Sequence, residues 1–451
     1  MDVLNLIPSF GGLISTILAF IVALSIIVSV HEYGHYIVGR WSGIHADVFS
    51  LGFGPVLYAR TDRYGTRWQI AALPFGGYVK FKGDADAASG KDGEAMAVLT
   101  AAERRRTMHG APLWARAATV AAGPLFNFAF AIMIFTVFFM WRGVATETPV
   151  VGSVNPLPAF SDALRPGDAI LALDGTPTPD NPAFYAAIQQ LQSKPSVQYR
   201  IRRDGAELDV EGPFPFPPLV GGVNPGTPAA KAGIQSGDVV QSINGTPIHA
   251  FDDLIKTIPT FEGKPLTLQL WRPAIDGAEP QTITATLVPK PMDLPTRDGG
   301  FETRWAIGLT SGLFYEPLTR NPGPGEALVD GVWQTYEIIR TSLSGLQHIV
   351  SGAISTCNLS GPIGIAETSG AAASMGLVAF IWFIAVLSTA VGLMNLFPIP
   401  VLDGGHLLFH AYEAITRRPP SDKALRVLMG SGLVLLLALM VFALSNDVFC
   451  P

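Results

Sequence analysis

Four long apolar stretches constrain the fold of this chain more than any other feature of its sequence. They lie near residues 10–30, 117–140, 377–398 and 427–446. Each is long enough to cross a hydrocarbon layer of about 30 Å, because a helix does so with roughly 20 apolar residues. Of all residues 49% are hydrophobic and only 15% are charged, a composition typical of membrane proteins. We therefore expect four transmembrane helices, the first of them retained rather than cleaved as a signal peptide.

Basic residues beside these stretches predict the orientation of the chain. They concentrate in the loop between the first two helices and in the loop between the last two, and such basic loops remain in the cytoplasm. The long segment between the second and third helices, and both termini, should then be extracytoplasmic. The net charge of -6 gives no argument for a nucleic acid partner, and none is expected. The basic residues are Arg40, Arg60, Arg63, Arg67, Lys80, Lys82, Arg104, Arg105, Arg106, Arg116, Arg417, Arg418, Lys423 and Arg426.

The first apolar stretch ends in the sequence HEYGH, residues 31–35. On a helix, positions i and i+4 share one face, so His31 and His35 can offer imidazole nitrogens to one metal ion while Glu32 lies beside them. This is the His-Glu-x-x-His pattern of zinc enzymes. Polar residues at the end of a membrane helix are costly unless they face the protein interior or bind something. The alternative is a cluster at the membrane interface that water satisfies.

A catalytic zinc ion takes three protein ligands and keeps a fourth position for water, so two histidines do not complete the site. The stretch MNLFPIPVLDGGHLLFH, residues 394–410, contains candidates for the third ligand. Asp403 follows a Pro-x-Pro break, and the two glycines after it allow a close approach of the backbone. Two alternatives stay open: Asp403 as the N-cap of the following helix, and His406 with His410 as a competing pair at i and i+4.

Together, HEYGH and the distal NLFPIPVLDGG resemble the site-2 protease family of intramembrane zinc metalloproteases, in particular its bacterial regulator-of-sigma-E protease branch. The resemblance implies that His31, His35 and Asp403 bind one catalytic Zn2+. It implies that Glu32 is the general base that takes a proton from the water activated by zinc. The active site should lie near the cytoplasmic end of the first helix, at a depth that water reaches.

The resemblance also suggests residues that handle the substrate. The stretch GPLFNF, residues 123–128, matches a family motif that approaches the active site, and it contains Asn127. Asn395 matches the asparagine of the family's third-helix motif. The alternative is that both asparagines only form hydrogen bonds between helices, and that the Gly-Pro pair of 123–128 only kinks the second helix.

Residues 48–81 contain two strand-like runs on either side of TDRYGT, which predicts a β-hairpin. Gly52 and Gly54 interrupt the pattern of the first run and are two further candidates for substrate handling. The hairpin is expected to associate with the membrane and to offer an edge to which a substrate adds as a strand. The alternative is a plain cytoplasmic hairpin.

An internal repeat follows the second apolar stretch. PAFSDALRPGDAILALDGTP, residues 158–177, matches PAAKAGIQSGDVVQSINGTP, residues 228–247. Each copy predicts a short helix, a turn, an apolar strand and a second turn, and the pattern resembles bacterial PDZ domains. Such domains can bind peptides by strand addition or can block access sterically, and both possibilities stay open. Beyond them, 325–350 predicts an amphipathic helix on the outer membrane surface, and 359–367 predicts a loop.

The expected fold is a multi-pass α-helical membrane protein with four transmembrane helices, a cytoplasmic membrane-associated β-hairpin and two extracytoplasmic PDZ-like α+β domains. Cys357 and Cys450 are too few for a disulfide framework, and the sequence leaves open whether they pair. The expected segments are a first helix (1–47), a hairpin loop (48–82), a cytoplasmic loop (83–116), a second helix (117–142), PDZ-like domains 1 (143–212) and 2 (213–292), a linker with an amphipathic helix (293–370), a third helix with the Leu-Asp-Gly loop (371–426) and a fourth helix with its tail (427–451).

The resemblance implies an endopeptidase of the bacterial inner membrane that cleaves transmembrane segments of single-pass membrane proteins. Its partners would be the lipid bilayer and substrates such as an anti-sigma factor trimmed by another protease in a stress response, or remnant signal peptides. Two other functions are compatible with parts of the sequence. A metal transporter would spread its ligands through the membrane, whereas here they cluster at one depth. A PDZ scaffold with an inactive site is disfavoured by the intact HEYGH and Asp403.

Overall fold

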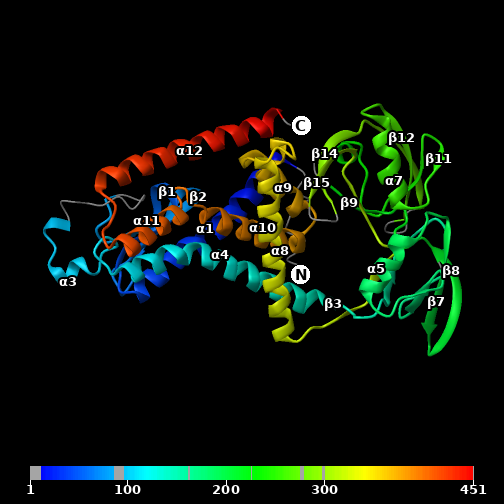
Figure 1. The fold of residues 1–451 in the computed structure, drawn as a ribbon, viewed down its shortest axis with the longest axis horizontal. Helices are drawn as coiled ribbons and strands as arrows, with labels where there is room; N and C mark the ends of the chain where they lie inside the picture. Colours follow the sequence, from blue (N-terminus) through cyan, green and yellow to red (C-terminus); the bar gives the residue numbers. More distant parts are fainter. Residues whose placement is uncertain are drawn as a thin grey trace. The chain divides into compact units, whose positions relative to one another are not determined.

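The computed structural model describes residues 12–85, 96–160, 163–224, 226–274, 279–296 and 300–449. The chain forms two compact units (Figure 1). The first, called the helical unit here, consists of Met1–Val137, Pro324–Gln347 and Thr356–Pro451. The second, called the repeat unit, consists of Phe138–Gly323 and His348–Ser355. Cys450 lies outside the described residues, so whether it pairs with Cys357 stays open, as it does from the sequence.

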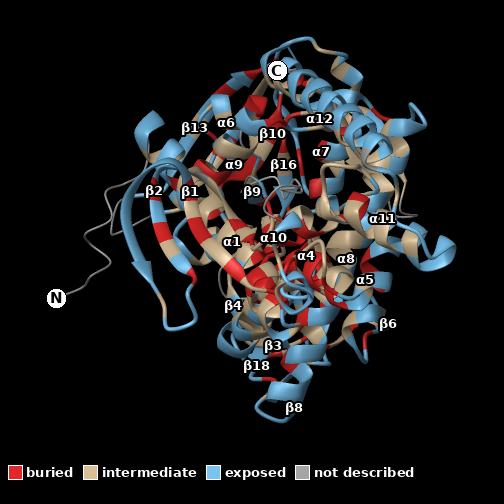
Figure 2. Cartoon of the chain, turned by 90° about the vertical axis from the view of Figure 1, so that its left-hand side faces the viewer, coloured by how far each residue is buried: buried red, intermediate tan, exposed pale blue. Residues whose placement is uncertain are grey.

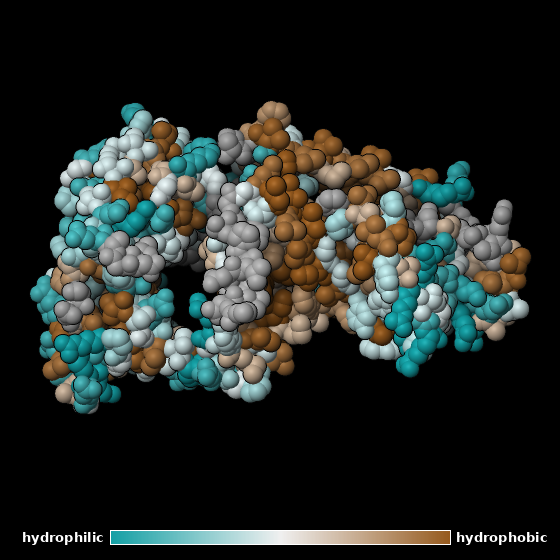
Figure 3. All heavy atoms as spheres, turned by 180° about the vertical axis from the view of Figure 1, so that it is seen from behind, coloured by the Kyte–Doolittle hydropathy of each residue, from teal (hydrophilic) through white to brown (hydrophobic). Residues whose placement is uncertain are grey.

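Four long helices are apolar enough to cross a membrane, which confirms the four stretches predicted from the sequence. Only 11% to 39% of the residues in their most apolar windows are buried inside the protein. Most of this apolar surface therefore faces outward, as contact with lipid requires, and a broad hydrophobic area lies on part of the visible face of the helical unit (Figure 3). The helices are α1 (Leu13–Trp41), α4 (Leu113–Arg142), α10 (Leu377–Asn395) and α12 (Asp422–Phe449).

Helices α1, α4 and α10 pack closely because glycines lie where they cross. A Cβ atom added to Gly34 of α1 would lie 2.6 Å from the carbonyl oxygen of Ala122 in α4, and one added to Gly392 of α10 would lie 3.1 Å from that of Pro124. Small residues let membrane helices approach in this way. Buried residues gather where the three helices meet (Figure 2).

The predicted hairpin is present. Strands β1 (Ala46–Thr61) and β2 (Arg67–Phe81) flank a turn in which the Asp62 carboxylate accepts hydrogen bonds from the backbone of Tyr64 and Thr66. This is the local bonding that makes Asp a frequent turn residue.

Both long strands bend, so the hairpin is more than two strands wide. Residues 48–51 of β1 pair with 67–70 on one side and with 77–80 on the other, while the stretch 56–61 of β1 pairs with 67–71. Gly52 and Gly54 supply the bend, with φ angles of +91° and +83° that favour glycine. Residues 67–70 are therefore paired on both sides, and among the described residues no strand pairs with the outer edge of 77–81.

Further helices lie in the helical unit, in whole or for most of their length. The amphipathic helix predicted at 325–350 is confirmed as α8 (Pro324–Val350). The loop expected at 359–367 is wrong, because α9 (Pro362–Ser374) begins there. Asp447 of α12 accepts hydrogen bonds from the backbone N–H groups of Gly361 and Ile363, so a distant side chain satisfies the first turn of α9. The others are α3 (Ala101–Arg104), η3 (Thr356–Asn358) and α11 (Asp403–Thr416).

The repeat unit contains two four-stranded sheets with the same connectivity, β6-β5-β7-β8 and β11-β10-β12-β13. Equivalent residues repeat the details: Asp174 and Asn244 both have a φ of 48° at the same turn. The structure therefore confirms the internal repeat. The elements are β5 (Ala169–Leu173), β6 (Thr176–Pro177), α5 (Asn181–Gln190), β7 (Ser196–Arg203), β8 (Ala206–Pro213), α6 (Pro228–Lys231), β10 (Val239–Ile243), β11 (Thr246–Pro247), α7 (Phe251–Thr257), η2 (Ile258–Phe261), β12 (Leu266–Arg272) and β13 (Gln281–Leu287).

The second repeat is nested inside the first. After it, the chain returns and pairs β16 with β9, then β17 with β4, then β18 with β3. Phe314 and Tyr315, from this returning segment, are buried in the core of the first repeat. The remaining strands are β3 (Val144–Ala145), β4 (Val151–Val154), β9 (Val220–Val223), β14 (Lys290–Pro295), β15 (Phe301–Ala306), β16 (Leu309–Ser311), β17 (Tyr315–Pro317) and β18 (Thr319–Arg320).

Candidate metal centre

The structure brings together the three residues predicted to bind a metal. His31 and His35 lie one turn apart on α1, and Asp403 is the first residue of α11. The Nε2 atoms of the histidines are 3.2 Å apart. Asp403 Oδ2 lies 3.1 Å from Nε2 of His31 and 3.5 Å from Nε2 of His35. Among the described residues, this is the group of three donors that could hold a metal ion.

The spacing of these donors fits a zinc ion. Tetrahedral bonds of ~2.0–2.1 Å place two ligand atoms about 3.3 Å apart, close to the three observed separations. Asp403 Oδ2 is buried and lies near both histidine nitrogens without a hydrogen-bond partner. A buried carboxylate oxygen without a partner is costly, and a cation would remove that cost.

Helix α4 holds both imidazole rings in place. Nδ1 of His35 lies 2.8 Å from the carbonyl oxygen of Thr119, and Nδ1 of His31 lies 3.2 Å from the side-chain amide of Asn127. Between these contacts, α4 needs a residue without a side chain. A Cβ atom at Gly123 would lie 2.4 Å from His35 Nε2 and 2.8 Å from His31 Cε1.

We expect Gly123→Ala to weaken metal binding by tenfold or more, about the loss that follows when a neighbour that orients a ligand is removed. The added methyl group must displace one or both rings. Metal content after dialysis against a chelator measures the effect. Gly430→Ala is the matched control, because Gly430 is also helical and has nothing within 4 Å of an added Cβ. Equal metal retention by the two variants would contradict this role of Gly123.

Asp403 is positioned by the two glycines that follow it. A Cβ atom at Gly404 would lie 2.3 Å from the carbonyl oxygens of Leu396 and Phe397, and one at Gly405 would lie 2.3 Å from that of Ile399. The start of α11 is thus pressed against the preceding Pro-x-Pro turn, which only glycine permits. The N-cap of α11 is Leu402, so Asp403 is not the N-cap considered from the sequence.

The far end of α11 is fixed by an ion pair that the sequence did not indicate. The Arg116 guanidinium of α4 donates hydrogen bonds of 3.0 Å and 2.7 Å to the carboxylate of Glu413. Such bidentate pairs have a defined geometry. The competing pair His406 and His410 is not part of the three-donor group. Burial and the nearby Arg116 lower the pKa of His410 to about 4, so its ring is neutral at physiological pH.

Glu32 lies beside the centre and against the hairpin. It follows His31 directly on α1, and a Cβ atom added to Gly77 of β2 would lie 3.5 Å from its Cγ. The other predicted residues lie elsewhere. Asn395 donates a hydrogen bond to the carbonyl oxygen of Val391 in its own helix, and Gly52 and Gly54 form the bend of β1.

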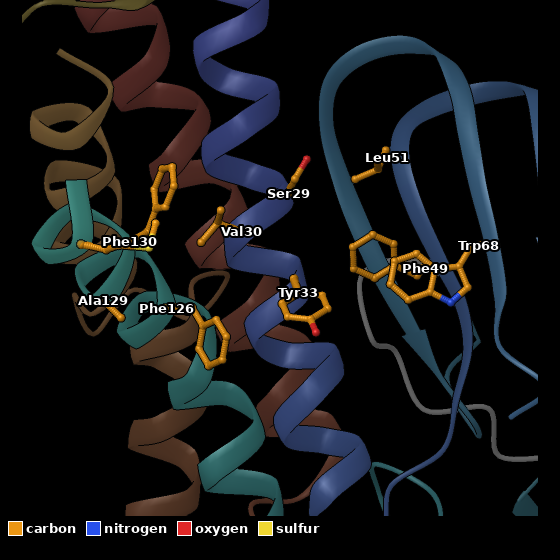
Figure 4. Close-up of a pocket in the computed structure, with 10 residues that line it drawn as sticks. Ser29, Val30, Tyr33, Phe49, Leu51, Trp68, Phe126, Ala129 and Phe130 are labelled. Atoms are coloured by element: carbon orange, nitrogen blue, oxygen red, sulfur yellow. The ribbon is translucent and has the colours of Figure 1, made fainter. Parts of the chain in front are cut away.

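An apolar cavity of about 510 Å³ lies between α1, α4 and the hairpin (Figure 4). It is bounded on α1 by Ser29, Val30 and Tyr33, whereas neither His31 nor His35 lines it. At 3.6 residues per turn, positions 29, 30 and 33 share one face of a helix and positions 31 and 35 lie on the opposite face, so the cavity and the metal donors lie on different faces of α1. The remaining lining residues are Phe49, Leu51, Trp68, Phe126, Ala129, Phe130 and Met133.

Comparison with known proteins agrees with this geometry. The model of Peptidase family M50 matches residues 19–439. A protein of Agrobacterium fabrum named "Putative zinc metalloprotease" is 35% identical, with 98% of this chain and 98% of that protein aligned. A protein of Salmonella typhimurium named "Regulator of sigma-E protease RseP" is 33% identical, with 95% of this chain and 97% of that protein aligned. The chain therefore belongs to peptidase family M50, the site-2 protease family of metalloproteases, as its two motifs predicted.

Proposed function

We propose that the protein is a zinc-dependent endopeptidase that cleaves transmembrane segments of single-pass membrane proteins. The observation that carries this proposal is the group His31, His35 and Asp403, which stands with Glu32 at the end of an apolar helix long enough to span a membrane. Zinc is its cofactor, held by these three residues. The donors leave one tetrahedral position, as a catalytic zinc site requires.

The chemistry divides between the ion and one side chain. Bound zinc acidifies a water molecule and polarises the carbonyl of the peptide bond to be cut. Glu32 accepts a proton from the attacking water and later donates it to the leaving amine, the two transfers that peptide hydrolysis needs. Helix α4 excludes other ring orientations by its contacts with His31 and His35.

A peptide bond inside a helix is tied into hydrogen bonds and shielded by side chains, so the substrate must unwind before water attacks. Its freed backbone groups need partners. We propose that the edge of 77–81 supplies these partners, because its first residue, Gly77, lies close to Glu32 and its outer side has no strand partner among the described residues. Residues 67–70 are excluded from this role because they are paired on both sides. Cross-linking from 77–81 to a substrate trapped on Glu32→Gln protein tests the assignment.

Asn395, beside the Pro-x-Pro turn, is proposed to contact the unwound substrate, and Gly52 and Gly54 to shape the hairpin that receives it. We further propose that the hairpin associates with the cytoplasmic face of the bacterial inner membrane, that α8 lies on the outer surface, and that the repeat unit and both termini are extracytoplasmic. The name of the Salmonella relative supports an anti-sigma factor as one substrate; remnant signal peptides are another.

The two repeats are proposed to be PDZ-like domains that filter substrates. We expect their complete removal to relax selectivity and to leave the chemistry intact, because every metal donor belongs to the helical unit. Ala145 pairs with Thr319, so an Asn-Gly turn can replace residues 146–318. Excision of 150–290 alone would remove β4 and β9 but leave their partner strands unpaired.

The readout of this excision is cleavage of full-length, untrimmed membrane substrates, which the intact protein should reject. The same excision combined with Glu32→Gln is the control for contaminating proteases. If the folded, excised protein cleaves neither long nor trimmed substrates, the repeats do more than filter.

The function itself is tested with purified protein in lipid vesicles and a model single-pass substrate. Cleavage should stop on chelation, return on adding zinc, and map by mass spectrometry to the apolar span of the substrate. Cuts only outside the span, or activity that survives complete removal of metal, would contradict the proposal.

A further inference from the structure

Asn127 is fully buried in α4 and stands against His31. Its side-chain amide nitrogen is 3.2 Å from Nδ1 of His31, and its amide oxygen Oδ1 is buried without a hydrogen-bond partner. The oxygen and nitrogen of an amide have nearly the same shape, so their assignment follows from the hydrogen bonds that each can make.

The chemistry of His31 decides between the two orientations. A histidine that ligates a metal through Nε2 uses the lone pair of that nitrogen, so its proton must reside on Nδ1. An amide NH2 facing this Nδ1–H would put two donors against each other and would leave Oδ1 unsatisfied. A half rotation of the Asn127 amide about its Cβ–Cγ bond exchanges Oδ1 and the NH2 group. Oδ1 then accepts a hydrogen bond from Nδ1–H of His31, which is the partner that the buried oxygen lacks.

His35 provides an internal comparison. Its Nδ1 lies 2.8 Å from the carbonyl oxygen of Thr119, a group that can only accept. His35 is therefore held with its proton on Nδ1, which leaves the lone pair of Nε2 to bind a metal ion. With the amide turned, His31 has the same arrangement, so α4 supplies one acceptor to each ring.

Asn127 is itself held from the other side. Ser388 of α10 donates a hydrogen bond of 3.0 Å to its backbone carbonyl oxygen, and a Cβ atom added to Gly392 would lie 3.2 Å from the Asn127 Cβ. Helix α10 thus fixes Asn127, and Asn127 fixes the ring on α1. The side chain faces His31 and is fully buried.

We propose that Asn127 is a positioning residue: its Oδ1 accepts the Nδ1 proton of His31 and keeps that ring in the tautomer whose Nε2 can bind zinc. This inference rests on the proposed function, because it takes His31 as a zinc ligand. It replaces the substrate-handling role that the sequence suggested for Asn127.

The deciding variant is Asn127→Asp, because a carboxylate can only accept a hydrogen bond. If Oδ1 faces His31, Asp keeps the contact; if the NH2 group does, Asp loses it. We expect Asn127→Asp to retain zinc affinity within a few fold of the wild type. Asn127→Leu, of similar size but without an acceptor, should weaken it by roughly 10–100-fold, as loss of such partners typically does. Competition with a chelator of known affinity measures both, without any need for activity.

Asn395→Leu is the matched control, since Asn395 is also a membrane-helix asparagine but bonds within its own helix; its zinc affinity should equal that of the wild type. The proposal is overturned if Asn127→Asp loses as much affinity as Asn127→Leu, or if Asn127→Leu binds zinc like the wild type. Should Asn127→Leu fail to fold, Asn127→Asp still decides. The ligand set is tested separately with His31→Ala. If this variant binds zinc as tightly as the wild type, the proposed ligand set is wrong.

Discussion

Glu32→Gln is expected to lower the rate of substrate cleavage by at least ~10²–10⁴-fold, the range that general acid–base catalysis supplies. Glutamine has nearly the same shape but cannot take a proton from the attacking water. Zinc should remain at one ion per protein, because Glu32 is not among the three donors. Cleavage of a membrane substrate and metal content should be measured on the same preparation.

Glu367→Gln provides a matched control for this prediction, because Glu367 is exposed on α9. It should cleave at the wild-type rate. If Glu32→Gln cleaves substrate appreciably at full zinc occupancy, Glu32 is not the general base. If Glu32→Gln loses zinc, Glu32 is one of the zinc ligands.

Asp403→Ala should abolish both activity and tight zinc binding. It leaves two histidines to hold the ion, whereas catalytic zinc sites use three protein ligands. The loss of zinc affinity should exceed the roughly 10–100-fold expected when a residue that only hydrogen-bonds to a ligand is removed. Titration with zinc in a chelator buffer should therefore show whether Asp403 is a direct ligand or only such a partner. Activity should not return at zinc concentrations that saturate the wild type.

His406→Ala is the control for Asp403→Ala, because it lies on the same short helix and outside the three-donor group. Its zinc content should match that of the wild type. If His406→Ala releases zinc and Asp403→Ala retains it, the ligand assignment is wrong.

The sequence predicted what depends on local pattern. The four long helices follow from unbroken apolar composition, and the donors on α1 follow from the i, i+4 spacing of His31 and His35. Asp403 was found through a motif, and the structure adds the reason for the glycines after it: they allow α11 to begin against the backbone of 396–400.

What the sequence could not indicate depends on partners far away in the chain. The stretch 359–367 contains Gly and Pro and was interpreted as a loop; α9 forms because Asp447, more than 80 residues later, satisfies its first backbone N–H groups. Gly123 was noted only as part of a possible kink, since no local pattern reveals that two imidazole rings from α1 pack against it. The pairing of 67–70 on both sides was likewise hidden, because it requires β1 to bend so that 48–51 and 58–61 lie on opposite sides of these residues.

The nesting of the repeats sets an order of events during synthesis. The first repeat cannot close its core until Phe314 and Tyr315 arrive, although its own strands through β8 end at Pro213. About 100 residues separate these points, and at roughly 5–20 residues per second the ribosome needs about 5–20 s to supply them. The second repeat has its sheet of β10–β13 complete within this interval. The apolar core of the first repeat thus stays unfinished until its last strand arrives, a period in which a chaperone would protect it from aggregation.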